Sequence, residues 1–226
     1  MAKLPRQPDH AYLEQLTPEI RKIPAGTALA RVYFRGGQHP VRWHTPRYFG
    51  PMASARFDHH RPDENGKPRL QRRGVLYCAL AHSRFGGLDV GLAEVFQRTR
   101  IVHTTRHDPA WAIFRSRHEL RLLDLTGPFP TLAGASQALM SGPRASARAW
   151  ARAFHEVYAE LHGLIYRSSM SGDGLAIALN ERAVGAGALP RSPELNLQLS
   201  EPRIRRMVTN AASRVGYALI PPLRSG

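Results

Sequence analysis

The stretch "ALARVYFRGG", residues 28–37, is the most informative place to begin predicting the fold. Its first seven residues mix β-branched, aromatic and small apolar side chains, which predicts a short buried strand. A full positive charge, Arg31, lies in the middle of this strand. An unpaired buried charge is unfavourable, so we expect either an anion bound beside Arg31 or an edge strand from which its side chain reaches solvent.

The segments around this strand predict an α+β fold, because helices and strands are mixed without regular strand–helix–strand alternation. Residues 35–73 are rich in Gly, Pro, His and Arg and show no periodicity, so they are expected to form a long loop. Further strands are predicted over residues 74–81, 118–125, 163–169, 174–181 and 217–222, with a turn at 170–174. Helices are predicted over residues 9–23, 87–99, 146–161 and 200–216.

The composition is that of a globular protein. The chain has 226 residues, of which 42% are hydrophobic and 22% charged, and this balance supports a packed core. We assign residues 1–25 to an N-terminal helical extension and residues 26–226 to a single domain. No apolar run approaches the roughly 18 residues of a membrane span, and the N-terminus lacks an apolar signal region. The single cysteine, Cys78, fits a reducing compartment, so we expect a cytoplasmic protein.

The formal net charge of +15 has two interpretations. Basic proteins often bind nucleic acid, an anionic surface or an acidic protein. The 32 lysines and arginines are nevertheless spread along the whole chain and are mainly arginine, a usage that also follows from a GC-rich genome. The segment "GPRASARAWAR", residues 142–152, predicts a basic helix face that either contacts phosphates or is simply solvated.

Several polar side chains fall where a ligand cleft would place them. Strand alternation puts Arg31, Tyr77 and Ser168 on faces that also carry apolar residues, which is how a cleft over a sheet is lined. Glu94 lies off the apolar stripe of its helix. Taken singly, each has a simpler interpretation: an arginine reaching solvent, a core tyrosine, a turn serine and a solvated glutamate.

A metal site is not predicted. Asp58, His59 and His60 are adjacent on a loop and lack the i,i+4 or cysteine-based spacing of a zinc site. H-E-x-x-H, C-x-x-C and Walker A motifs do not occur in the sequence.

The order of these pieces resembles the RES-domain family, the toxin components of bacterial toxin–antitoxin systems. The family is named for an arginine, a glutamate and a serine, and the matching segments here are "ARVYF", "GLAEVF" and "GLIYRSS". "GPMASARFD" followed by "GVLYCALA" is similar to a further family segment. The resemblance runs from about residue 28 to residue 180. The residues that it singles out are Arg31, Arg56, Tyr77, Glu94 and Ser168, with Ser169 as the neighbouring alternative to Ser168.

The resemblance implies an ADP-ribosyltransferase-like fold, in which a split, mixed or antiparallel sheet with flanking helices surrounds an NAD+ cleft. It implies consumption of NAD+ by hydrolysis or phosphorolysis, without a metal. It also implies a partner, an Xre-type helix-turn-helix antitoxin that covers the cleft in a hetero-oligomer. One alternative is ADP-ribose transfer to a specific host protein, and a second is a non-enzymatic, basic nucleic-acid-binding protein.

The residues suit NAD+ chemistry. A guanidinium binds a pyrophosphate bidentately, which would explain the charge of Arg31 and give Arg56 a similar role. Nicotinamide leaves as a neutral molecule, so one carboxylate, Glu94, suffices to hold a ribose hydroxyl and stabilise the oxocarbenium-like transition state. Tyr77 offers a flat face to the nicotinamide ring, and Ser168 a hydroxyl that fixes the ring or the ribose.

Overall fold

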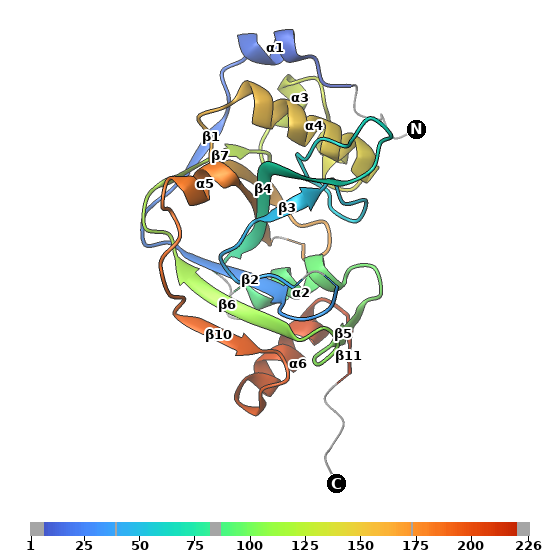
Figure 1. Cartoon of the computed structure of the whole chain (residues 1–226), viewed down its shortest axis with the longest axis vertical. Coiled ribbons are helices and arrows are strands. Elements are labelled where there is room, and N and C mark those ends of the chain that lie inside the picture. The colour runs from blue at the N-terminus through green and yellow to red at the C-terminus, as the bar shows by residue number, and fades with distance from the viewer. Residues whose placement is uncertain (1–6, 39, 82–86, 173, 221–226) are drawn as a thin grey trace.

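A computed structural model describes residues 7–220 except residues 39, 82–86 and 173 (Figure 1). The strands are β1 (Ile20–Ile23), β2 (Ala28–Phe34), β3 (Arg47–Gly50), β4 (Arg69–Leu80), β5 (Ile101–His103), β6 (Pro109–Arg115), β7 (Leu120–Asp124), β8 (Gly163–Arg167), β9 (Leu175–Asn180), β10 (Leu195–Gln198) and β11 (Ala218–Ile220). The helices are α1 (His10–Gln15), α2 (Leu88–Phe96), α3 (Phe129–Leu132), α4 (Arg144–Val157), α5 (Glu181–Gly185) and α6 (Arg205–Arg214), with 3-10 turns η1 (Gln137–Leu139) and η2 (Pro202–Ile204).

The fold class is α+β, as the sequence predicts. Within the described residues, nine strands form a mixed, mostly antiparallel sheet in the order β1-β7-β8-β9-β4-β2-β6-β10, with β3 added beside β4. Only β7 and β8 run parallel in this sheet, and β11 and β5 form a separate parallel pair. Helices α1, α3 and α4 lie toward one end of the molecule, and α2 and α6 toward the other (Figure 1).

Strand β4 divides one of its edges between two partners. Its end pairs with the start of β2 at two positions, Leu29↔Leu80 and Ala30↔Ala79. Its first part pairs with β3 instead, from Gly50↔Arg69 to Arg47↔Val75. Strand β2 continues along β6 over its whole length, so it turns away from β4 beyond Ala30. The sheet therefore splits between β2 and β3.

Three hydrophobic clusters fill the two sides of this divided sheet. The first lies under α4 and includes Trp150 and Phe154. The second packs on the opposite side and includes Trp43. The third joins α2 and α6 to β2 and β6 and includes Trp111. None of the helices in the described ranges is long and apolar enough to cross a membrane.

The predicted N-terminal helix over residues 9–23 is only partly correct. Asp9 caps α1 as expected, because its Oδ1 accepts a hydrogen bond from the Tyr12 N–H at 3.2 Å. The helix ends at Gln15, and β1 then joins the main sheet antiparallel to β7. The hydrogen bonds of β1 are made with β7, about 100 residues later in the chain. Local sequence periodicity does not reveal such a distant partner. Residues 1–6 of the predicted extension lie outside the described residues.

The loop predicted over residues 35–73 was also too long. It contains β3, and β4 begins at Arg69 rather than at residue 74. The first residues of β4 are mostly exposed and carry no apolar alternation, so only their pairing with β3 identifies them as a strand. Strand β6 was missed because it is buried at nearly every position and so lacks a periodic pattern. Asp173 of the predicted turn and Pro221 and Pro222 of the last predicted strand lie outside the described residues.

Packing under α4 predicts a sharp difference between two leucines. Leu123 is 0% exposed in the first cluster, whereas Leu132 is 60% exposed. Leu123→Ala should lower the free energy of unfolding by about 2–5 kcal/mol, because it leaves a cavity. Leu132→Ala, the matched control, should change it by less than about 0.5 kcal/mol. Urea denaturation of both variants measures the difference, and equal effects would contradict this packing.

Candidate functional site

The structure brings Glu94 and Ser168 together, although 74 positions separate them in the chain. The Ser168 hydroxyl donates a hydrogen bond to Glu94 Oε1 at 2.6 Å. Ser168 directly follows β8, and its backbone N–H donates to the Gly174 carbonyl at 2.8 Å, which fixes its position. The serine side chain is buried, and its oxygen also accepts from the Met170 N–H. Ser168, rather than Ser169, is therefore the serine that meets the glutamate.

Helix α2 carries Glu94 and lies very close to β2. A Cβ built on Gly91 would lie 2.7 Å from Val32 Cγ2, so only a glycine permits this approach. Leu88 and Leu92 of the same helix are fully buried against the sheet. Glu94, outside that apolar stripe, points its carboxylate to the end of β8.

The electrostatic surroundings of Glu94 are dominated by burial and by two arginines. Burial raises the pKa of the Glu94 carboxyl above its ordinary value, while the hydrogen bond from Ser168 and the charges of Arg56 and Arg144 act in the opposite direction. The carboxylate is thus held in a partly dry environment next to positive charge. This is the setting in which a carboxylate interacts most strongly with a cationic reacting centre.

Arg56 and Tyr77 also lie in this region. Arg56 Nη1 donates to the carbonyls of Gly142, at 2.7 Å, and Leu139, at 3.1 Å. Burial, and then the nearby charge of Arg144, lower the pKa of Arg56. The Tyr77 hydroxyl is buried and has no hydrogen-bond partner among the described residues. Burial raises the pKa of Tyr77, and the charge of Asp58, followed by that of Glu94, adds to this effect.

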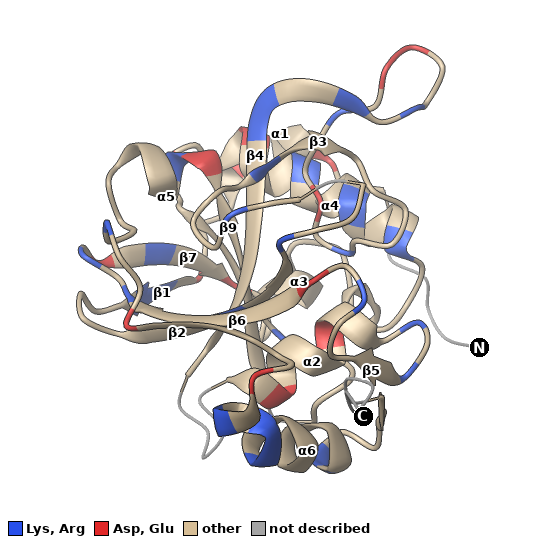
Figure 2. Cartoon of the chain, turned by 60° about the horizontal axis from the view of Figure 1, so that its bottom comes forward, with Lys and Arg blue, Asp and Glu red and all other residues tan. Residues whose placement is uncertain are grey.

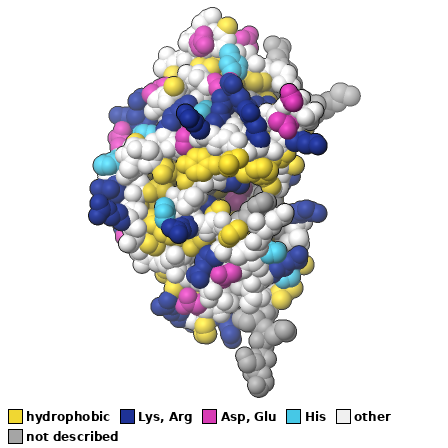
Figure 3. Space-filling view, viewed as in Figure 1, with side chains coloured by type: hydrophobic (Ala, Val, Ile, Leu, Met, Phe, Trp, Pro, Cys, Tyr) yellow, Lys and Arg dark blue, Asp and Glu magenta, His cyan; other side chains and the backbone are white. Residues whose placement is uncertain are grey.

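A cleft opens beside these residues at the start of α4. Figure 3 shows a hollow near the middle of the molecule, bordered by a band of hydrophobic side chains. The residues that line the cleft with polar or flexible side chains are Arg56, Gln97, Ser141, Arg144, Arg148, Ser169 and Met170. Arg144 and Arg148 belong to the basic helix face noted in the sequence, but their place beside Glu94 depends on how α4 packs.

Arg31 lies elsewhere. Its Nη1 donates to the carbonyls of Trp43, at 2.8 Å, and Thr45, at 3.1 Å, in the segment just before β3. Its neighbour Tyr33 packs in the second cluster, whereas Tyr77 packs against the first, so Arg31 and Tyr77 border different clusters. Burial lowers the pKa of the Arg31 guanidinium to about 10. The partners that the structure records for this charge are thus two carbonyls of the segment before β3 and the ring of Tyr33, whose centroid lies 5.7 Å from the guanidinium carbon.

The adjacent residues Asp58, His59 and His60 separate into two groups. Asp58 is fully buried and accepts hydrogen bonds from Arg47 Nη2 and the Met52 N–H, each at 2.7 Å. His60 Nδ1 bonds the same carboxylate. The His59 ring stacks on the His60 ring, with 5.6 Å between their centroids, but its Nε2 bonds Glu181 of a second cluster. The three residues therefore do not direct their polar atoms to one site.

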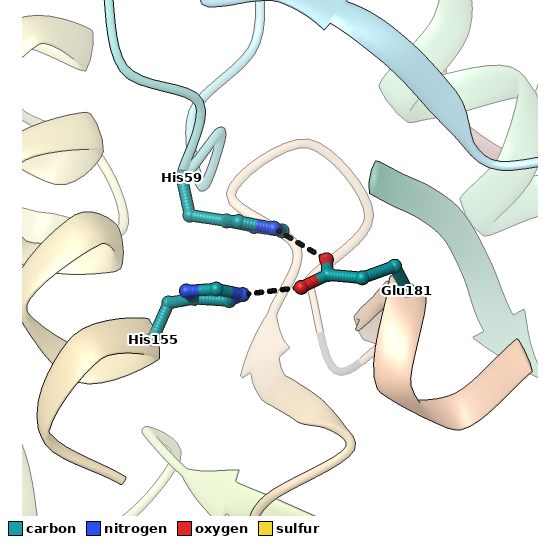
Figure 4. A group of neighbouring side chains, drawn as sticks. All are labelled: His59, His155 and Glu181. Atoms are coloured by element: carbon teal, nitrogen blue, oxygen red, sulfur yellow. Dashed lines mark hydrogen bonds and ion pairs between the residues drawn. The ribbon is translucent and has the colours of Figure 1, made fainter. Parts of the chain in front are cut away.

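That second cluster consists of His59, His155 on α4 and Glu181 at the start of α5 (Figure 4). His155 Nε2 lies 2.8 Å from Glu181 Oε1, and His59 Nε2 lies 3.3 Å from Oε2. The Gly74 N–H also donates to Oε2, at 2.9 Å. Burial opposes ionisation of Glu181, but the hydrogen bonds from both histidines and from Gly74 outweigh it and hold the pKa of this carboxyl well below its usual range.

Two imidazoles and a carboxylate are residue types that could hold a zinc ion. In this arrangement, however, the His59 and His155 rings are stacked, 4.2 Å apart between centroids and 12° from parallel. An ion bound to both Nε2 atoms must lie in both ring planes, which nearly parallel, stacked rings do not allow. The Nε2 atoms instead fit as donors to Glu181, and the three residues tie α4 and α5 to the loop that carries His59.

Comparisons with known proteins give one informative likeness. No protein-family model matches the chain, and no curated protein matches it. A chain of the crystal structure of the M. tuberculosis MbcT–MbcA toxin–antitoxin complex aligns with it at a TM-score of 0.50 and 15% identity. The alignment covers 83% of this chain and 92% of that one. At this identity the likeness shows only that the two chains share a fold.

The histidine cluster predicts a loss of stability in mild acid. Burial lowers the pKa of His59 to about 4, from an ordinary value of 6.5, so the folded protein binds fewer protons than the unfolded chain between these pH values. The free energy of unfolding should therefore fall, by an amount on the order of 3 kcal/mol, as the pH drops from 6.5 to 4. Urea denaturation at half-unit pH steps measures this slope.

The control for this prediction is a histidine in solvent. His59→Gln should reduce the slope between pH 6.5 and 5.5, above the range in which ordinary carboxyl groups titrate. His118→Gln removes an exposed imidazole and should leave the slope unchanged. If the slope were unaltered in His59→Gln, His59 would not be the cause of the lower free energy of unfolding in acid.

Proposed function

We propose that this protein is the NAD+-consuming toxin of a toxin–antitoxin module. It would break the bond between nicotinamide and ribose, by hydrolysis or phosphorolysis, and so arrest growth. The observation that carries the proposal is the 2.6 Å hydrogen bond between Ser168 and Glu94, which sits beside an arginine-lined cleft. The likeness to a chain of a toxin–antitoxin complex supports the same class of protein.

The chemistry follows from the charge changes of the reaction. When the C1′–N bond breaks, its electron pair goes to the nicotinamide nitrogen, which becomes neutral, and positive charge develops on the ribose. Glu94 would stabilise that charge or hold a ribose hydroxyl, and Ser168 would orient the carboxylate. A water oxygen then forms the new C1′–O bond and releases one proton to solvent, or an oxygen of a phosphate ion forms that bond instead. The neutral leaving group makes a general acid unnecessary.

The remaining site residues would bind the rest of the dinucleotide. Arg56 uses its Nη1 to bond two carbonyls, so it would contact the diphosphate through its other guanidinium nitrogens. Tyr77 would pack its ring against nicotinamide, a role that rests on the family resemblance. The phosphate role of Arg31 stays a prediction of the family resemblance, because its recorded partners are two carbonyls and the ring of Tyr33. NAD+ enters this scheme as a substrate.

The partner would be a helix-turn-helix antitoxin that covers the cleft in a hetero-oligomer. The related chain was crystallised in a toxin–antitoxin complex, which supports such a partner. The net charge of +15 would favour an acidic surface on it. Figure 2 shows lysines and arginines on both α4 and α6, so positive charge lies at both ends of the molecule.

Two alternatives remain distinct from this proposal. Transfer of ADP-ribose to a host protein would use the same residues and differ only in the acceptor. A basic nucleic-acid-binding protein would bind DNA or RNA in a strongly salt-dependent way and would not need Glu94.

Removal of the Glu94 charge tests the proposed reaction. Glu94→Gln should release nicotinamide from NAD+ at least about a hundredfold more slowly than the natural protein, because the group that stabilises the transition state is neutral. Chromatography of free nicotinamide, with and without inorganic phosphate, measures the rate and the acceptor. Glu64→Gln changes an exposed loop carboxylate and serves as the matched control. Equal rates of nicotinamide release by the two folded variants would show that Glu94 does not take part in the reaction.

Expression in bacteria tests the toxin assignment. Induction of this chain alone should stop growth and lower intracellular NAD+, whereas the Glu94→Gln chain at the same level should do neither. Growth curves and total NAD+ over the first hours provide the measurement. A harmless natural chain with steady NAD+ would argue against a toxin, and the basic-binder alternative would then be preferred.

A further inference from the structure

Three arginines line the cleft at the start of α4. Their total positive charge exceeds the negative charge of the one carboxylate beside it. The cleft is lined by Arg56, Arg144 and Arg148, and none of its described lining residues is acidic. The neighbouring carboxylate is Glu94, whose interactions include both Arg56 and Arg144. Burial, and then the repulsion between the charges of Arg56 and Arg144, lower the pKa of Arg56. Three guanidiniums against one carboxylate leave about two positive charges without an opposite charge in the cleft.

The guanidiniums are fixed in place by carbonyl and amide oxygens. Arg148 Nη1 donates to the Ala53 carbonyl at 3.1 Å, and Arg144 Nη2 donates to Gln97 Oε1 at 2.6 Å. The Gln97 Nε2 donates in turn to the Glu94 carbonyl at 2.8 Å, so Arg144 is linked to the helix that carries the glutamate. Rigidly held arginines lose little conformational freedom on binding a ligand.

Arg144 also has a donor that lacks an acceptor. Its Nε is buried and has no hydrogen-bond partner among the described residues. A buried donor without an acceptor is unfavourable and uncommon in folded proteins. An oxyanion between Arg56 and Arg144 would reduce their mutual repulsion, and an oxyanion that reached this Nε would supply its missing acceptor.

The backbone at the start of α4 adds to the same positive potential. The helix has 14 residues, begins without a side-chain cap at Pro143 and has no acidic residue in its first turn. Ala145 of that turn lines the cleft. The first N–H groups of a helix carry partial positive charge, which favours an anion at this position.

We propose that Arg144 and Arg148, together with Arg56, form a phosphate-binding site at the start of α4. The ligand chemistry is a phosphate group with at least two oxygens available to guanidinium forks. It could belong to the diphosphate of a dinucleotide or to free inorganic phosphate used as the acceptor. The proposal extends the proposed function to specific binding residues, and it can be tested without any NAD+ cleavage.

Binding of unreactive probes tests the site. Calorimetric titrations of the full chain with ADP-ribose, adenosine and inorganic phosphate compare a dinucleotide-like diphosphate, a nucleoside without phosphate and the free ion. Arg144→Gln and Arg148→Gln should each weaken binding of a phosphate-bearing probe by roughly 10- to 100-fold, the usual effect of losing a charge-assisted hydrogen bond. Arg191→Gln removes an exposed arginine and should leave the affinity unchanged.

The pattern of losses identifies the source of the phosphate. Loss of ADP-ribose binding with intact phosphate binding assigns the site to the diphosphate, and the reverse assigns it to the free ion. If Arg191→Gln weakened binding as much as the cleft variants do, the effect would be general charge attraction. The proposal would be overturned if the cleft variants kept their affinity, or if the natural chain bound neither phosphate probe. If NAD+ is not cleaved but the cleft variants lose binding, the proposed reaction fails and the phosphate site stands.

Discussion

The division of one edge of β4 between β2 and β3 is the constraint on which the rest of the structure depends. A strand edge can hydrogen-bond only one partner at each position, so β2 must leave β4 where β3 begins. The gap between the two is filled by the segment before β3, whose carbonyls at Trp43 and Thr45 are held by Arg31. A cation suits this place because it donates hydrogen bonds to carbonyl oxygens that have no strand beside them.

The candidate site lies beside the first and third hydrophobic clusters, under α4 and around α2, on the same divided sheet. Helix α2 follows β4 in the sequence and packs on β2, while β8 belongs to the strands on the opposite side of β4. The hydrogen bond between Ser168 and Glu94 therefore joins two parts of the sheet that the split would otherwise leave apart. Burial makes this contact strong, and the nearby arginines keep a charged carboxylate tolerable there.

Helix α4 is positioned from both of its ends. Near its C-terminal end, His155 bonds Glu181 and stacks on His59, so the helix is tied to α5 and to the loop before β4. Near its N-terminal end, Arg144 bonds Gln97 of the segment after α2. The buried Trp150 and Phe154 hold the middle of the helix on the sheet. These contacts explain how a basic helix face, which would otherwise be a solvated surface, comes to line a cleft.

The sequence by itself determined the α+β class, the strand at residues 28–34, the helix that carries Glu94 and the order of the residues expected in the site. These features depend on local periodicity, turn residues and short motifs, which neighbouring residues carry. It did not determine β1, β3 or β6, the partners of Arg31, or the meeting of His59 with His155 and Glu181. Those depend on which distant segments pair, and a strand without alternation or a histidine 96 positions from its neighbour gives no local signal. Only the tertiary structure, by packing α2 and α4 around the split sheet, decided which charged side chains face one another.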